Sequence, residues 1–140
     1  MSATTVIGQP SFTSSSTTPV TGSSLNAPVG SFSDGTRLII SDNINNRVLI
    51  WNSYPTQNGQ AADVVLGHSD FTSSAANDGG SVSNKTLNRP QGLYFDGTKL
   101  FVADRNNNRV LIWNSLPTTN FQAADVVVGQ PDFTTVSAGV

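Results

Sequence analysis

Two short stretches of the chain hold polar residues whose types and spacing could bind an ion. Each is an aspartate followed, three residues later, by Asn-Asn-Arg. Carboxylate and amide oxygens are ligands for Ca²⁺, and an arginine could hold an anion. The same residues can instead satisfy a turn backbone, with the arginine paired to the aspartate across a hairpin. We favour this structural role for all eight residues: Asp42, Asn45, Asn46, Arg47, Asp104, Asn107, Asn108 and Arg109.

Few other residues could carry out chemistry. His68 is the single histidine and the chain has no cysteine, so the usual zinc ligands are scarce. No serine and aspartate stand at a spacing that indicates a catalytic triad with His68. The sequence therefore predicts no enzyme activity, no metal site and no cofactor.

Two tryptophans occur at the same place in two similar stretches and could stack on sugars or bases. Trp51 and Trp113 each end the stretch Arg-Val-Leu-Ile-Trp, whose aliphatic residues are typical of a buried strand. A buried indole N–H group needs an acceptor. We predict that both side chains pack between repeated units.

The bulk composition excludes several classes of protein. The 140 residues carry a formal net charge of -2, which leaves no basic surface for nucleic acid. The longest apolar runs have about five residues, far fewer than the ~20 of a membrane span. The start of the chain lacks the basic and apolar regions of a signal peptide. We expect neither nucleic acid nor membrane as a partner, and the composition leaves the cellular compartment open.

The chain contains an internal repeat of about 62 residues. Residues 25–73 align with residues 87–135, and about 30 of about 50 positions are identical. A partial third copy opens the chain, because "VIGQPSFT" at residues 6–13 matches "VVGQPDFT" at residues 127–134. Such close identity fits a natural fragment, a reconstructed ancestor or a designed protein.

Each repeat predicts four strands. Asp-Gly turns close the first strand, β-branched and aromatic residues fill the second and third, and a longer loop precedes the fourth. The runs "RLII", "KLFV" and "RVLIW" do not alternate between apolar and polar residues, which indicates sheets covered on both faces. The predicted strands are 29–35, 36–42, 45–52 and 62–67, then 91–97, 98–104, 107–114 and 124–129.

The segment "LNRPQGLYFDGTKLFVADRNNNRVLIWN" resembles the NHL repeat. The resemblance covers residues 25–52 and 87–114, although the units are about 20 residues longer than short NHL repeats. It implies an all-β fold of four-stranded antiparallel propeller blades, typically six in the ring. It leaves function open, since this fold hosts scaffolds, binders and enzymes. The matching positions include Pro28, Gly30, Asp42, Asn45, Asn46 and Arg47 and their equivalents Pro90, Gly92, Asp104, Asn107, Asn108 and Arg109.

Two blades cannot close a ring of four to eight blades, so we expect copies of the chain to complete it. A homotrimer with six blades is the first expectation, and a homotetramer with eight is the second. The main function is then self-assembly as a structural module. The expected organisation is an outer strand of a preceding blade at 1–13, a linker at 14–24, blade 1 at 25–71, an inter-blade loop at 72–86, blade 2 at 87–133 and a tail at 134–140.

The alternative function is a scaffold that binds protein, glycan or another ligand at the central face of the propeller. In a propeller the loops between strands two and three share a face with the connections from strand four to the next blade. Positions on that face that differ between the repeats are the candidates for specificity. Those candidates are Arg89, Gln91 and Arg105.

Overall fold

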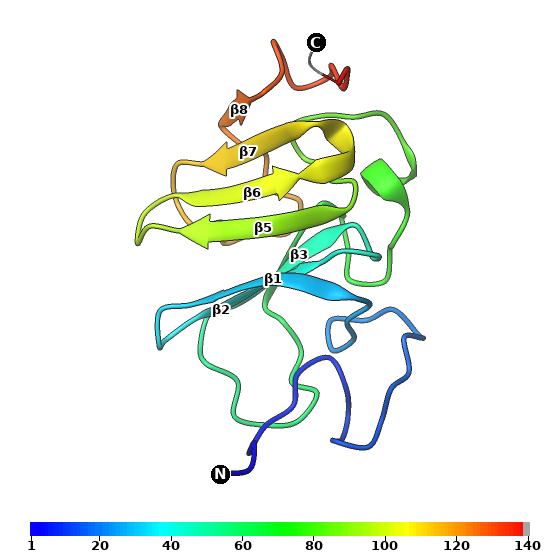
Figure 1. The fold of residues 1–140 in the computed structure, drawn as a ribbon, viewed down its shortest axis with the longest axis vertical. Coiled ribbons are helices and arrows are strands. Elements are labelled where there is room, and N and C mark those ends of the chain that lie inside the picture. The colour runs from blue at the N-terminus through cyan, green and yellow to red at the C-terminus, as the bar shows by residue number, and fades with distance from the viewer. Residues whose placement is uncertain (139–140) are drawn as a thin grey trace.

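The computed structural model describes residues 1–138 and has two four-stranded antiparallel sheets (Figure 1). Residues 139 and 140 of the predicted tail lie outside the described residues. Sheet 1 has the order β1-β2-β3-β4, and sheet 2 has the order β5-β6-β7-β8. The prediction of an all-β fold with two four-stranded units, consistent with two propeller blades, is confirmed.

The strands are shorter than predicted, because the turn residues at their ends leave the hydrogen-bonded ladders. Sheet 1 comprises β1 (Pro28–Ser33), β2 (Leu38–Asp42), β3 (Arg47–Trp51) and β4 (Val64–Leu66). Sheet 2 comprises β5 (Pro90–Phe95), β6 (Leu100–Asp104), β7 (Arg109–Trp113) and β8 (Val126–Val128).

Within the residues that the structure describes, helical structure is limited to two short 3-10 segments. They are η1 (Ala76–Gly79), in the connection between the sheets, and η2 (Arg105–Asn107), in the turn after β6. Among residues 1–138, no helix has the length and apolarity that crossing a membrane requires.

Sheet 1 presents one face to sheet 2, and we call this its forward face. Alternation along the strands places Ile39, Val48 and Ile50 on this face together with Val64 and Leu66 of the outer strand. All five are buried in one core cluster with residues of sheet 2. The interface between the sheets is therefore a buried apolar layer, which provides most of the driving force for stacking them.

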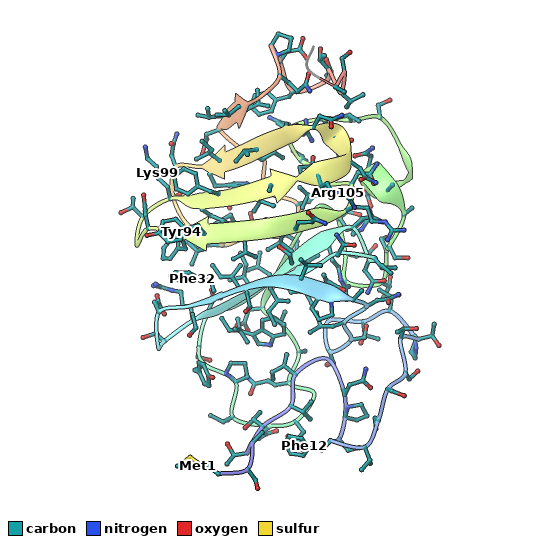
Figure 2. The ribbon with its side chains drawn as sticks, viewed as in Figure 1. Met1, Phe12, Phe32, Tyr94, Lys99 and Arg105 are labelled. Atoms are coloured by element: carbon teal, nitrogen blue, oxygen red, sulfur yellow. The ribbon has the colours of Figure 1, made fainter. Side chains whose placement is uncertain are left out.

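Sheet 2 contributes its opposite face, the rear face, to the same cluster. Its largest members are Phe95, Leu100, Leu111 and Trp113. At one edge of the layer, Phe32 of β1 meets Tyr94 of β5 edge-on, with ring centroids 5.8 Å apart. Figure 2 shows both side chains at the same end of β1 and β5. The rear face of sheet 1 forms a second cluster with Leu49 and Trp51 at its centre.

Residues 1–13, predicted as an outer strand, contain no strand in the described structure, because the chain provides no preceding sheet for them to join. They lie instead beside the rear face of sheet 1, where Ile7 packs against the second cluster. Figure 1 places the N-terminus at the end of the molecule opposite β8.

One buried group in the layer between the sheets lacks a hydrogen-bond partner. The Oγ atom of Ser41 has no partner, and the residue is 0% exposed. The repeat places Ala103 at the equivalent position of sheet 2, where it is half-buried.

We expect Ser41→Ala to raise the free energy of unfolding by about 1 kcal/mol, because it removes a buried hydroxyl that makes no hydrogen bond. Urea denaturation followed by circular dichroism measures the change. Ala103→Ser is the matched control and should be nearly neutral in the single chain, where that side chain is only half-buried. A lower midpoint for Ser41→Ala would contradict the expectation.

Candidate functional site

The repeated Asp-x-x-Asn-Asn-Arg motif joins β2 to β3 in sheet 1. The Asp42 carboxylate accepts hydrogen bonds from the backbone N–H of Asn26 at 2.7 Å, the Asn45 side-chain amide at 2.9 Å and Arg47 Nε at 2.8 Å. Asp42 and Arg47 are both 0% exposed. All three donors belong to the turn or to the segment that leads into β1. The carboxylate therefore stabilises the fold by holding these two segments together.

The Arg47 guanidinium reaches beyond the turn into two connecting segments. Its terminal nitrogens donate to the carbonyl oxygens of Phe71 at 2.7 Å, Thr21 at 2.8 Å and Ser24 at 2.8 Å. Thr21 and Ser24 precede sheet 1, whereas Phe71 follows it. Arg47 therefore holds the connection that enters the sheet and the connection that leaves it.

Sheet 2 repeats this arrangement at the equivalent residues. Asp104 accepts from the Asn88 N–H at 2.7 Å, from the Asn107 amide at 2.8 Å and from Arg109 Nε at 2.8 Å. The Arg109 guanidinium donates to backbone carbonyls of the two connecting segments: Ser83, Thr86 and Phe133. The two sites have the same donors, acceptors and order along the chain.

The electrostatics of the pair are those of a buried structural ion pair. Burial raises the pKa of Asp104, while hydrogen bonds from Asn88, Asn107 and Arg109 act in the opposite direction. A buried arginine and aspartate persist only when their remaining hydrogen-bonding groups are satisfied. Because the neighbouring carbonyls and amides satisfy them here, the motif offers no open position to a metal or an anion.

The second asparagine of each motif adopts a left-handed backbone, with φ of 56° at Asn46 and 54° at Asn108. The Asn46 amide donates to the Ser74 carbonyl at 2.9 Å, and its Oδ1 atom accepts from the Arg89 N–H at 2.8 Å. This side chain therefore joins the turn of sheet 1 to the start of sheet 2. Asn108 bonds the Val136 carbonyl at 2.9 Å.

Both tryptophans are 0% exposed, so neither presents a ring to a ligand. Trp113 belongs to the cluster between the two sheets, and Trp51 belongs to the cluster on the rear face of sheet 1. Each indole N–H finds a backbone acceptor, the carbonyl of Gln60 at 3.0 Å for Trp51 and that of Gln122 at 3.1 Å for Trp113.

His68 is buried and links the connection between the two sheets to the turn between β2 and β3. Its Nδ1 atom lies 2.8 Å from Asp78 Oδ1, and its Nε2 atom lies 2.9 Å from the Asn45 carbonyl oxygen. Both ring nitrogens are therefore held by groups of the fold, one in the connection between the sheets and one in the turn after β2. No pattern in the sequence indicates either of these partners.

The three candidate binding residues lie near one end of sheet 2. Because Pro90 pairs with Asp104, the flanking residues Arg89 and Arg105 stand on neighbouring strand ends. Arg105, labelled in Figure 2, is exposed, whereas Arg89 and Gln91 are half-buried. In the described part of the chain neither arginine takes part in an ion pair. The structure thus brings the three residues close in the fold without giving them a shared ligand geometry.

Four exposed aspartates have pKa values below the ordinary range, because they cap turns. Hydrogen bonds from Thr72 and Ser73 lower the pKa of Asp70 to about 2, and those from Thr134 and Thr135 lower the pKa of Asp132 to about 2. Backbone N–H groups lower the pKa of the Asp-Gly turn residues Asp34 and Asp96.

No cluster of three or more His, Cys, Asp or Glu side chains that could bind a metal occurs among residues 1–138. No family model matches the chain, and no curated protein matches it either.

We expect Arg109→Lys to lower the free energy of unfolding by about 3–5 kcal/mol, because an ammonium cannot replace the planar guanidinium and leaves buried acceptors unpaired. Urea denaturation measures the loss. Arg37→Lys is the matched control, since Arg37 pairs with Asp34 at the surface, and it should cost less than about 1 kcal/mol. A loss for Arg109→Lys as small as that of the control would show that the hydrogen bonds of the Arg109 guanidinium contribute little to stability.

Acid should destabilise the protein in part through Asp70 and Asp132. Their pKa values are depressed in the folded state to about 2 from 3.8, so their contribution is present above about pH 4 and is lost as the pH falls towards 2. We expect the double variant Asp70→Asn, Asp132→Asn to be less stable at pH 5 and to lose less stability between pH 5 and pH 2.5. Urea midpoints at both pH values measure this, and an unchanged acid dependence would count against it.

Proposed function

We propose that the chain is a self-assembling structural module of the NHL-type β-propeller, without catalytic activity. Copies stack head to tail, and three copies form a six-bladed ring. The observation that carries the proposal is an exposed apolar face on sheet 2. The equivalent positions of sheet 1 are buried. The resemblance of residues 25–52 and 87–114 to the NHL repeat supports the choice of six blades over the eight of a tetramer.

The forward faces of the two sheets have equivalent residues but different exposures. In sheet 1, Val64 and Leu66 are 2% and 0% exposed beneath sheet 2. Their equivalents in sheet 2, Val126 and Val128, are 40% and 52% exposed. A shallow apolar groove crosses the same face, lined by Gly92, Leu93, Tyr94, Phe101, Ala103 and Val110. An exposed apolar surface of this kind favours association with a complementary partner.

The complementary surface is the rear face of sheet 1 in a second copy. Inside the chain, the rear face of sheet 2 covers the forward face of sheet 1 with Leu111 and Trp113 at its centre. The rear face of sheet 1 has Leu49 and Trp51 at the equivalent positions, where they are 0% exposed. Beside them this face has an accessible groove lined by Ile7, Pro28 and Ile40, and this groove is the part that a second copy can contact. A contact between copies can therefore reuse the contact within the chain. Because it joins two different surfaces, successive copies form a ring when the rotation between them closes.

We expect light scattering after size exclusion to give three times the 14.7 kDa mass of one chain at micromolar concentration. Val110→Lys places a charge in the apolar groove and should yield folded monomers. Tyr54→Lys is the control, because Tyr54 is an apolar residue that is 56% exposed, more than the half-buried Val110, and lies outside the groove. A monomeric mass for the unchanged protein with a β-sheet circular dichroism spectrum would refute self-assembly, and a fourfold mass would replace the trimer with a tetramer.

A further inference from the structure

Two segments of the chain have closely related sequences and compete for one structural position. The N-terminal segment, residues 5–13, contains "VIGQPSFT", and the C-terminal segment, residues 126–134, contains "VVGQPDFT". The same sequence pattern in the middle of the chain, "VLGHSDFT" at residues 65–72, begins within β4 of sheet 1 and continues into the connection to sheet 2.

The N-terminal segment contacts sheet 1 as β4 contacts sheet 2. Val6 accepts from the Gly59 N–H at 2.9 Å, and its own N–H donates to Asn58 Oδ1 at 3.0 Å. Val65 makes the same two bonds one repeat later, to the Phe121 N–H at 2.9 Å and to Asn120 Oδ1 at 3.0 Å. Val6 therefore occupies the position that the equivalent valine of a preceding blade's outer strand would occupy.

The neighbouring glycines repeat the correspondence. Gly8, Gly67 and Gly129 have positive φ angles of 87°, 95° and 93°. Leu25 lies against Gly8 as Leu87 lies against Gly67, so closely that a Cβ atom on Gly8 would come within 2.7 Å of Leu25 Cδ1. The N-terminal segment is thus a fitted part of the rear face of sheet 1.

This geometry produces a steric conflict in the assembly proposed above. When sheet 1 of a second copy stacks on the forward face of sheet 2, its N-terminal segment and β8 of the first copy require the same place beside β7. Within the chain, β8 fills that place by pairing Val126, Val127 and Val128 with β7. Two strands cannot pair with one edge.

We infer that the N-terminal segment of the second copy replaces β8 and the C-terminal segment at the edge of β7. This inference rests on the proposed function and specifies how the copies join. Val6 would pair with Leu111 and Ile7 with Val110 of the neighbour, as Val127 and Val128 do within the chain. The N-terminal segment of each copy then becomes the outer strand of its neighbour's second blade.

Three observations favour exchange over retention of β8. Phe12 of the N-terminal segment is 54% exposed and is the equivalent of Phe133, whose carbonyl accepts from Arg109, so the incoming segment can supply the acceptor that the displaced segment gives up. Ile7 packs on the rear-face cluster, and Gly8 is buried, so removing the N-terminal segment uncovers apolar surface. The N-terminal segment also leads directly into the connection whose Thr21 and Ser24 carbonyls are held by Arg47.

Hydrogen exchange of the unchanged protein, followed by mass spectrometry at concentrations below and above assembly, tests the inference. We expect the amides of residues 126–134 to exchange faster in the oligomer than in the monomer and those of residues 5–13 to exchange more slowly. The reverse pattern would overturn the exchange and leave self-assembly intact. A protein that stays monomeric at every concentration would overturn the proposed function and the exchange with it.

Matched glycine variants give an independent readout. Gly8→Val strains a backbone at φ 87° and should weaken association by about tenfold or more. Gly129→Val strains the equivalent residue at φ 93° in the displaced segment and should leave association unchanged or strengthen it. Sedimentation equilibrium measures both, and weaker association for Gly129→Val alone would show that β8 stays in place.

Discussion

The buried pair of aspartate and arginine in each repeat is the interaction on which the rest of the structure depends. Removing two opposite charges from water is costly, and their attraction repays the cost only when their other hydrogen-bonding groups are satisfied. Those groups belong to segments far apart in the sequence. Arg47 and Arg109 can stay charged inside the protein only if the chain before and after each sheet passes close to the guanidinium. The pair therefore fixes the paths of the connections as well as one hairpin.

With the connections fixed, each sheet can present two different apolar faces to its neighbours. The strand period of two directs one set of side chains forward and the other rearward. The forward face of sheet 1 meets the rear face of sheet 2 in a single cluster that contains Trp113. Stacking of this kind uses the same surfaces at every step, which explains why the sequence repeats so closely in the strands and diverges in the connection containing η1.

Much of this fold could be predicted from sequence, because strands and tight turns have local signals. The β-branched runs and Asp-Gly pairs located all eight strands, and the aspartate–arginine pairing followed from the hairpin spacing. The carbonyls of Thr21 and Phe71 could not be anticipated, because no residue type marks a backbone acceptor. The same reason hid the partners of His68. The left-handed backbones of Ala27 and Arg89, with φ of 52° and 56°, also lack a local signal, since glycine or asparagine is expected there.

The arginine contacts also show where one folding unit ends and the next begins. A repeat counted from residue 25 to residue 71 omits Thr21 and Ser24. The carbonyls of these two residues accept hydrogen bonds from the arginine guanidinium of that same repeat. The unit that satisfies its own buried charges begins within the preceding connection, several residues upstream of the first strand. A gene duplication or a circular permutation that cuts inside 21–24 or 83–86 separates a charge from its acceptors. Cuts inside 72–82, between Phe71 and Ser83, preserve the contacts of both guanidinium groups, so the chemistry of one side chain sets the boundaries at which such a module can be copied.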